Sequence, residues 1–409
     1  MGYSKQAFKG FSWLGALRVF IRSLSFIKVA VLARLLLPAQ FGLFGIAGLV
    51  LALLETLTET GINVVLIQQT EDSDNYLDTA WIISIGRGVL ISALIFFSTP
   101  LIIKFFSSPE AKPILILMSL VPLIRGFINP AIVYFQKQLH FHKEFYFRST
   151  LMAAETIVTI ILILLTRSPS GLVYGLIFSA FLEVIMSFAF VKPWPSPKFE
   201  LNRLKEVLNR GKWVTAAAIF NYLFHQSDDI LVGKILNTTS LGFYQMAYKI
   251  STLPITEVAD TISKVTFPVF TKIALDKQRV KKAFFKVTAT ISALVIPFGL
   301  ILFFFTAPIV NLVLGPNWLS IIPVLKVLTV FGVVRAITGS ASALFLALNK
   351  QEYVMALTLF SILGLALTLY PLVLKFGILG AGLAALIGSL TAIPVIVICL
   401  VKVLKNDSN

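Results

Sequence analysis

Charged residues are scarce in this chain. Asp, Glu, Lys and Arg make up 13% of its 409 residues, whereas a soluble domain carries about 25%. The single cysteine, Cys399, excludes an internal disulfide and a zinc site built from cysteines. The sequence also lacks a glycine-rich phosphate-binding loop. These absences exclude a soluble catalytic fold and a disulfide scaffold, and neither a cofactor nor a metal ion is expected.

Apolar residues are abundant instead. They make up 57% of the chain, and the mean hydropathy is +0.89. A helix crosses a bilayer with about 20 mostly apolar residues, and windows of that length recur between short polar or Gly/Pro segments. They predict an all-α integral membrane protein with twelve spanning helices, at 11–36, 41–67, 79–106, 112–135, 146–166, 171–191, 213–236, 241–271, 284–307, 320–347, 353–374 and 378–403.

The distribution of basic residues predicts the orientation. The chain has 35 Lys and Arg against 19 Asp and Glu, a formal net charge of +16. Most of the loop cations fall in 137–148, 192–212 and 272–286, whereas the loops expected on the other side are short and nearly uncharged. Because basic residues gather in cytoplasmic loops, both termini are expected in the cytoplasm. The charge thus reflects a membrane and gives no reason to expect a nucleic-acid partner.

The domain organisation follows from the longest polar stretch, residues 192–212. It opens with Lys-Pro-Trp-Pro-Ser-Pro and continues with leucine and valine at helical spacing opposite basic residues. This pattern predicts a cytoplasmic connector, a Pro-rich turn followed by an amphipathic helix on the inner leaflet. The connector separates a six-helix lobe at 1–191 from a second six-helix lobe at 213–409.

The two lobes resemble each other in sequence. Residues 33–36 pair with 233–236 at an offset of 200 residues, and Arg125 pairs with Arg335 at an offset of 210, each within the fourth helix of its lobe. Parallel repeats of this kind are related by an axis along the membrane normal. The sequence therefore predicts two pseudo-symmetric lobes around a central cavity, an architecture suited to alternating access.

Charged residues within the expected spans are candidates for function. Each costs about 2.5 to 3.5 kcal/mol at the centre of a membrane helix, so it faces a cavity or a partner. Arg18, Arg22 and Lys28 share one face of the first helix and form a basic stripe. The alternative for any single charge is a structural ion pair between packed helices. The candidates for substrate binding are Arg18, Arg22, Lys28, Arg87, Arg125 and Arg335.

Four carboxylates are candidates for binding a coupling ion. Glu55 and Glu59 are expected one turn apart on the second helix, and Asp228 and Asp229 lie on the seventh. Two carboxylates one turn apart repel each other when both are ionised, so one should hold a proton or share a cation. The alternative is that they neutralise nearby arginines. Proton, sodium and no coupling ion all remain open.

A family resemblance is carried by two helix junctions. Residues 228–236 followed by 241–249 resemble the junction of the seventh and eighth helices of the oligosaccharide flippases. These polysaccharide transporters belong to the multidrug/oligosaccharidyl-lipid/polysaccharide exporter superfamily. Residues 33–48 resemble the first hairpin of the same family. The resemblance implies a flippase that moves an undecaprenyl-pyrophosphate-linked oligosaccharide across the bacterial cytoplasmic (inner) membrane for exopolysaccharide or lipopolysaccharide assembly.

The resemblance also implies a cavity lined mainly by helices one, two, seven and eight. Within it, the basic residues are expected to bind the pyrophosphate, because guanidinium groups make paired hydrogen bonds to phosphate oxygens. Membrane lipids are expected partners, and a polysaccharide polymerase and glycosyltransferases are compatible ones.

Two other classes of function compete with the flippase. A drug or small-molecule antiporter of the same superfamily would share the lobes, but cationic substrates would favour an acidic cavity over the arginines found here. A membrane polysaccharide polymerase or glycosyltransferase would need a sizeable outside loop or a catalytic pocket. The outside loops are only a few residues long, so no enzyme activity and no catalytic residue are expected.

Overall fold

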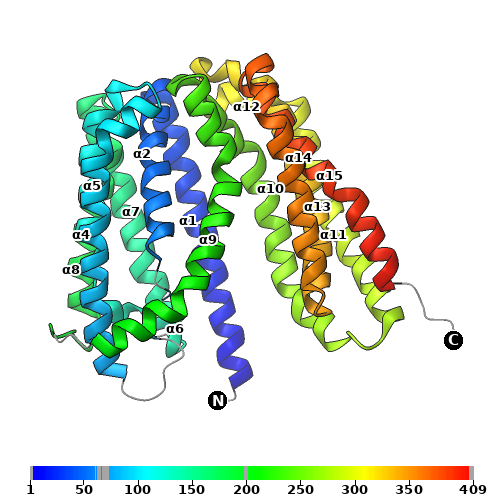
Figure 1. Cartoon of the computed structure of the whole chain (residues 1–409), viewed down its shortest axis with the longest axis horizontal. Coiled ribbons are helices and arrows are strands. Elements are labelled where there is room, and N and C mark those ends of the chain that lie inside the picture. Colours follow the sequence, from blue (N-terminus) through cyan, green and yellow to red (C-terminus); the bar gives the residue numbers. More distant parts are fainter. Residues whose placement is uncertain (1–2, 60, 62–65, 67–72, 198–200, 405–409) are drawn as a thin grey trace. The chain divides into compact units, whose positions relative to one another are not determined.

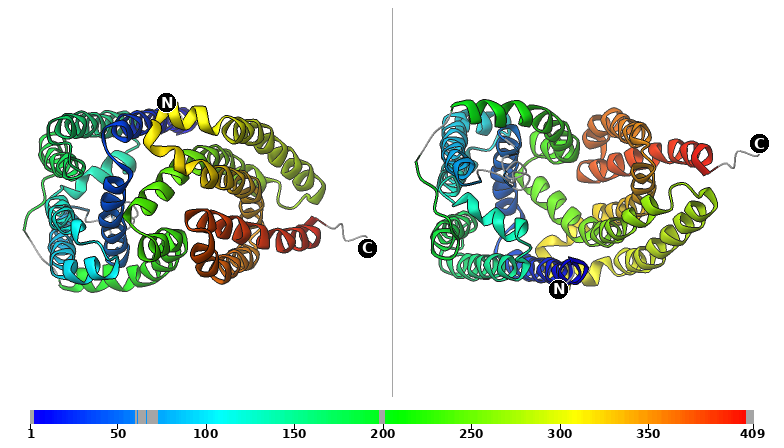
Figure 2. Two further views of the ribbon diagram at one scale, coloured as in Figure 1. Left: turned by 90° about the horizontal axis from the view of Figure 1, so that it is seen from above. Right: turned by 90° about the horizontal axis from the view of Figure 1, so that it is seen from below.

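The computed structural model describes residues 3–59, 61, 66, 73–197 and 201–404. Within these residues the chain is built from helices, without a β-strand. It divides into two compact units, Met1–Gln226 (unit 1) and Ser227–Asn409 (unit 2). Helix α9 (Leu201–Ile235) passes from one unit to the other. Figure 1 and the end-on views of Figure 2 show a bundle of long helices in each unit.

Besides most of α9, the described residues of unit 1 form seven α-helices and two short 3-10 turns, at Pro109–Ala111 and Pro130–Val133. The α-helices are α1 (Tyr3–Leu35), α2 (Pro38–Leu57), α4 (Ser73–Phe105), α5 (Lys112–Arg125), α6 (Tyr134–Lys137), α7 (Phe141–Thr166) and α8 (Ser170–Phe190). Helices α4 and α5 approach closely where Gly88 of α4 meets Gly126, the residue that follows α5. A Cβ atom on Gly126 would lie 2.9 Å from the carbonyl oxygen of Ser84. Apolar residues of α2, α4, α5 and α8 form the core there.

In unit 2 the residues that the structure describes form the end of α9, six further α-helices and a 3-10 turn at Pro316–Ile321. The α-helices are α10 (Thr238–Lys272), α11 (Lys277–Phe304), α12 (Thr306–Val313), α13 (Ile322–Ala347), α14 (Gln351–Phe376) and α15 (Ile378–Leu404). Helices α10 and α13 pack tightly, since a Cβ atom on Gly332 of α13 would lie 3.3 Å from the Cα of Thr252 on α10.

The structure confirms the all-α membrane fold. Each of the twelve expected spans overlaps a helix, and eight described helices are long and apolar enough to cross a membrane. A ninth candidate is the bent pair Pro109–Arg125 and Pro130–Lys137. Helices α1, α9 and α10, of 33, 35 and 35 residues, are also long enough to cross but are less apolar than these eight.

Several expected element boundaries differ from the structure, and three of the differences change where helices end or join. The second span was expected to reach residue 67, but α2 ends at Leu57. The span expected at 284–307 is interrupted at Phe305, between α11 and α12. Residues 201–212, expected as a short helix before the seventh span, form the first turns of α9.

The span expected at 112–135 is broken after Arg125, with an angle of 74° between its two parts. The break precedes Pro130, and a residue before proline is disfavoured in helical geometry. Asn129 there is extended, and its side chain accepts a hydrogen bond from the backbone N–H of Ala131. The amide group of Asn129 also donates to the carbonyl of Pro193, at 3.1 Å. The break is therefore a built feature, anchored to the segment after α8.

Candidate functional site

The helix ends of the two units reproduce the offset of 200 residues. Helix α1 ends at Leu35 and α2 begins at Pro38, whereas α9 ends at Ile235 and α10 begins at Thr238. Lys28 of α1 and Asp228 of α9 consequently occupy corresponding positions, at the same distance from the ends of their helices. Their surroundings can be compared directly.

Asp228 is buried and fully hydrogen-bonded. Its Oδ2 accepts a hydrogen bond of 2.6 Å from the hydroxyl of Tyr244 on α10, a side chain with no exposed surface. Its Oδ1 accepts a bond of 3.0 Å from the backbone N–H of Asp229. A hydrogen bond to a charged acceptor contributes about 1.5 to 3 kcal/mol. The carboxylate of Asp228 is thus held between two uncharged donors.

Arg335 of α13 lies near Asp228. Its Nη1 donates a hydrogen bond of 3.2 Å to the hydroxyl of Tyr248, and its guanidinium carbon lies 5.8 Å from the ring centre of Phe331. It also interacts electrostatically with Asp228. Because Tyr244 and Tyr248 are one turn apart on α10, they present both hydroxyls on one face. Helices α9, α10 and α13 therefore bring a carboxylate, two hydroxyls and a cation together.

Asp229 adds a second carboxylate beside the first. Its Oδ1 is buried and has no hydrogen-bond partner among the residues that the structure describes. The side chain of Gln245 forms a hydrogen bond with Asp229, and Lys249 interacts with it electrostatically. Two adjacent carboxylates, Asp228 buried and Asp229 half-buried, lie next to neutral donors and can take up one proton or one cation, because this relieves their mutual repulsion. We call Asp228, Asp229, Tyr244, Tyr248 and Arg335 the α9–α10–α13 cluster.

The corresponding position in unit 1 is occupied by an ion pair. The Nζ of Lys28 lies 2.6 Å from Oε1 of Glu155 on α7, and both side chains are about 15% exposed (15% and 14%). Arg18 and Arg22, expected on the same face of the helix, are exposed. The three residues of the expected basic stripe therefore differ in environment. Lys28 is paired within unit 1, and the two arginines are accessible.

Arg87 of α4 fixes the end of α2. Its Nη2 donates to the backbone carbonyl of Glu55 at 2.7 Å, and its Nε donates to the hydroxyl of Thr58 at 3.0 Å. A cation at the C-terminal end of a helix satisfies carbonyls that have no partner within the helix. Glu59 is exposed and lies beyond the end of α2, so the two glutamates do not share a helical turn as expected.

Arg125 and Arg335 do not have equivalent surroundings. Arg125 is the last residue of α5, at the break, and its Nε is buried without a hydrogen-bond partner among the described residues. Arg335 lies within the continuous helix α13 and contacts Tyr248. The sequence offset that pairs the two residues does not extend to their local structure.

The sequence prediction missed several residues of these sites. Tyr244 and Tyr248 had a usable signal, since polar aromatic residues at i and i+4 share a helix face.

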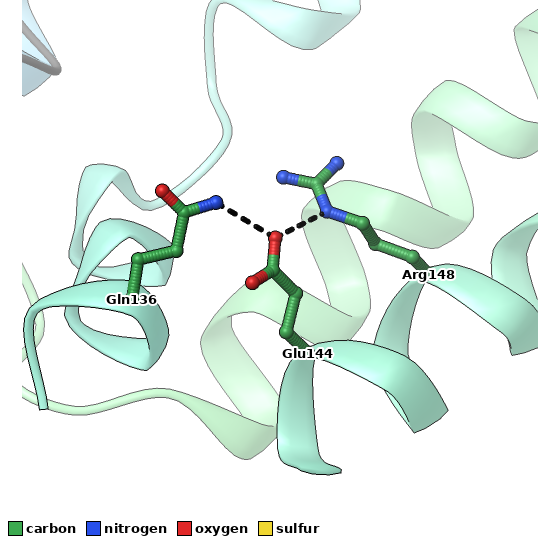
Figure 3. A network of polar contacts seen from close by, with 3 residues as sticks. All are labelled: Gln136, Glu144 and Arg148. Atoms are coloured by element: carbon green, nitrogen blue, oxygen red, sulfur yellow. Dashed lines mark hydrogen bonds and ion pairs between the residues drawn. The ribbon is translucent and has the colours of Figure 1, made fainter. Parts of the chain in front are cut away.

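Glu144 is buried near the start of α7, where its Oε1 accepts hydrogen bonds of 2.9 Å from both Gln136 and Arg148 (Figure 3). These bonds join α6 to α7 after the break. Glu144 therefore stabilises the fold of unit 1.

Comparison with known proteins gives consistent matches. Residues 31–323 match the family described as polysaccharide biosynthesis protein. The lipopolysaccharide biosynthesis protein WzxC of Escherichia coli (strain K12) is 27% identical over 354 residues, 86% of this chain and 72% of that protein. The teichuronic acid biosynthesis protein TuaB of Bacillus subtilis (strain 168) is 23% identical over 363 residues, 85% of this chain and 73% of that protein.

Solved structures share the fold. A lipid II flippase MurJ in an inward closed conformation aligns with a TM-score of 0.75 and 19% identity, over 95% of this chain and 88% of that one. An inward-facing multidrug resistance transporter of the MATE family aligns with a TM-score of 0.70 and 17% identity, over 95% and 96%. The family match covers more than half of the sequence, so this chain belongs to the polysaccharide biosynthesis protein family.

Proposed function

We propose that the protein is a flippase that moves a polyprenyl-pyrophosphate-linked oligosaccharide across the bacterial cytoplasmic membrane, for surface polysaccharide, exopolysaccharide or lipopolysaccharide assembly. The family match over residues 31–323 carries this proposal. It is supported by relatives named for lipopolysaccharide and teichuronic acid biosynthesis and by the fold shared with a lipid II flippase. Transport follows alternating access of the repeated lobes 1–191 and 213–409, with both termini in the cytoplasm.

Within this function, Arg18 and Arg22 bind the pyrophosphate. Both are exposed on α1, and a guanidinium group matches the geometry of two phosphate oxygens better than an ammonium group does. Arg125 is a further candidate because its buried Nε has no acceptor in the part of the chain that the structure describes. Lys28, Arg87 and Arg335 have protein partners within their own units, which favours structural or coupling roles for them.

The coupling ion is assigned to the α9–α10–α13 cluster. Asp228 and Asp229 are adjacent, and a hydroxyl, not a cation, donates the hydrogen bond to Asp228. Proton or sodium uptake there would neutralise one carboxylate and change the hydrogen bond of Tyr244. The geometry supports Glu55 and Glu59 less, since Glu59 is exposed and lies outside the helix.

The alternative function is an ion-coupled antiporter of drugs or other small molecules. The TM-score of 0.70 to a multidrug transporter favours it, because the same fold serves both substrate classes. A role as a membrane polymerase or glycosyltransferase has less support. The lipid II flippase and succinoglycan transport protein ExoT are named for moving material across membranes, not for catalysis. Polymerases and glycosyltransferases then enter as partners that consume or supply the substrate.

A flipping assay in proteoliposomes tests the proposal. A fluorescent undecaprenyl-pyrophosphate-linked oligosaccharide and a fluorescent phosphatidylcholine are placed in the outer leaflet, and a membrane-impermeant quencher follows their movement. We expect protein-dependent flipping of the first probe and none of the second. The variant with Arg18→Ala and Arg22→Ala should lose flipping of the lipid-linked probe. Arg34→Ala, on the same helix, is the control. Transport of a cationic dye without flipping of the lipid-linked probe would establish the antiporter instead.

A further inference from the structure

Unit 2 contains a pocket of about 290 Å³ away from the α9–α10–α13 cluster. It lies where the α10–α11 turn, the α13–α14 turn and the end of α15 meet. Three lysines from three different segments line it, namely Lys277, Lys350 and Lys402, and all three are exposed. Ligand pockets begin at about 300 Å³, so this one suits a small headgroup and is too small for an oligosaccharide.

The floor of the pocket is apolar and firmly packed. Val280 is buried and belongs to a core cluster shared by α10, α11, α13, α14 and α15. The ring of Tyr353 packs edge-on against Phe345 at 5.5 Å, and Val403 closes the side formed by α15. The pocket therefore has a fixed apolar floor and a rim of mobile ammonium groups, which suits a ligand with an anionic head and an apolar remainder.

The charges around the pocket favour an anion. Two carboxylates lie beside it, and each has a basic partner, Asp276 with Arg279 at 3.1 Å and Glu352 with Lys350 at 3.6 Å. With Lys277 and Lys402 added, cations outnumber the carboxylates. Lys350 is also the N-cap residue of α14 and makes no side-chain capping bond. The first N–H groups of α14 thus add partial positive charge at the same end.

Leu275 distinguishes a lipid from a soluble anion. It lies in the α10–α11 turn, next to Ala274 of the pocket, and its side chain is fully exposed (102%). A protruding leucine that lies between Lys272 and Lys277 suits a segment that enters the interface of a membrane. Because this turn belongs to the basic stretch 272–286, the positive-inside rule places it at the inner leaflet, where anionic lipids attract lysines.

We propose that the pocket formed by Lys277, Lys350, Lys402 and Tyr353 binds the phosphate headgroup of an anionic phospholipid, with Leu275 inserted beside it. The site is separate from the residues assigned to substrate and coupling ion. It anchors the ends of α10, α11, α14 and α15 to the membrane. The proposal does not depend on which substrate the protein moves.

Native mass spectrometry of the full-length protein in neutral detergent tests this site. Phosphatidylglycerol is titrated against the wild type, the pocket variant with Lys277→Gln, Lys350→Gln and Lys402→Gln, and a control with Lys281→Gln, Lys282→Gln and Lys286→Gln. The control removes the same charge from α11 without touching the pocket. We expect the pocket variant to bind the tightest lipid at least tenfold more weakly and the control to change less than twofold. Equal losses in both variants, or no loss in either, would overturn the proposal.

Two further arms distinguish the lipid from soluble phosphate. Inorganic phosphate and glycerophosphoglycerol, the headgroup without its chains, are added as competitors at the lipid concentration, and neither is expected to displace it. Leu275→Gln should weaken phosphatidylglycerol binding several-fold while leaving the pocket lysines intact. Full displacement by inorganic phosphate would show a site for a soluble anion and refute the lipid assignment. Lys402→Gln alone, at the end of α15, repeats the comparison of phosphatidylglycerol binding with wild type while changing the fold as little as possible.

Discussion

Lys28 in unit 1 and Asp228 in unit 2 stand at corresponding positions, yet they carry opposite charges and make different contacts. Lys28 forms an ion pair with Glu155, a residue of opposite charge on α7. Asp228 instead accepts a hydrogen bond from the uncharged hydroxyl of Tyr244 and lies next to a second carboxylate. An ion pair is satisfied when both members keep their charge, whereas adjacent carboxylates gain from neutralising one of them. The repeat therefore gives a structural site in one unit and a site suited to ion uptake in the other.

The largest expected effect is the loss of one member of the ion pair in unit 1. Lys28→Met should lower the free energy of unfolding by about 3 to 5 kcal/mol, because it leaves the carboxylate of Glu155 without its partner. The double variant with Lys28→Met and Glu155→Leu should regain most of that loss and flip substrate at a normal rate. Unfolding by denaturing detergent measures the first quantity, and the proteoliposome assay measures the second. A stable double variant that cannot flip would show that the pair has a transport role.

Removing the hydroxyl of Tyr244 is expected to have the next largest effect. Tyr244→Phe should cost about 1.5 to 3 kcal/mol of stability, because the hydrogen bond to a charged acceptor is lost in a buried place. Tyr248→Phe is the matched comparison, since its hydroxyl is less buried and bonds to a cation that also faces an aromatic ring. Equal losses in the two variants would contradict the assignment of Tyr244 as the principal partner of Asp228.

Arg335→Lys should have a smaller effect. The positive charge remains, but the ammonium group cannot reproduce the planar geometry of the guanidinium group near Phe331. A loss of about 0.5 to 1 kcal/mol is expected from the weakened cation–π contact. Thermal unfolding in detergent, with Arg34→Lys as the control, measures it. Unfolding of Arg335→Lys at the temperature of wild type would mean that only the charge matters.

Glu59→Gln should change almost nothing. The side chain is exposed and lies beyond α2, and surface substitutions of this kind stay within about 0.5 kcal/mol. Its response to an imposed ion gradient in the flipping assay should equal that of wild type. A lost gradient response in Glu59→Gln would return the coupling site to unit 1.

Hydropathy alone predicts the helices well, because the spans are long and apolar residues predominate in them. Hydropathy misses the break after Arg125, since the apolar residues on both sides of Pro130 form one continuous window. The Asn129–Pro130 pair was a usable signal for that break. Within the site, the sequence identifies Asp228 and Arg335 as unusual but gives no partners for them. Lys28 and Glu155 are 127 residues apart in the chain, and only the packing of α1 on α7 brings them together.

The repeat shows the same limit. The offset of 200 residues predicts that α1 and α9 end alike, which the structure confirms at Leu35 and Ile235. The same offset shows a cation at the shared position in one unit and a carboxylate in the other, but it does not predict their unrelated partners. Glu155 and Arg335 come from helices beyond the aligned hairpin, whereas Tyr244 lies within it, at the position that Phe44 occupies in unit 1.

The most direct test of the account is the gradient dependence of flipping in a variant with Asp228→Asn and Asp229→Asn. Proteoliposomes carrying the fluorescent lipid-linked oligosaccharide are assayed with and without an imposed proton or sodium gradient, next to wild type and the double variant of Lys28 and Glu155. The account predicts that a gradient accelerates flipping by wild type and by the unit 1 variant. The aspartate variant should flip at the same rate with and without the gradient. An aspartate variant that folds and still responds to the gradient as wild type does would contradict it.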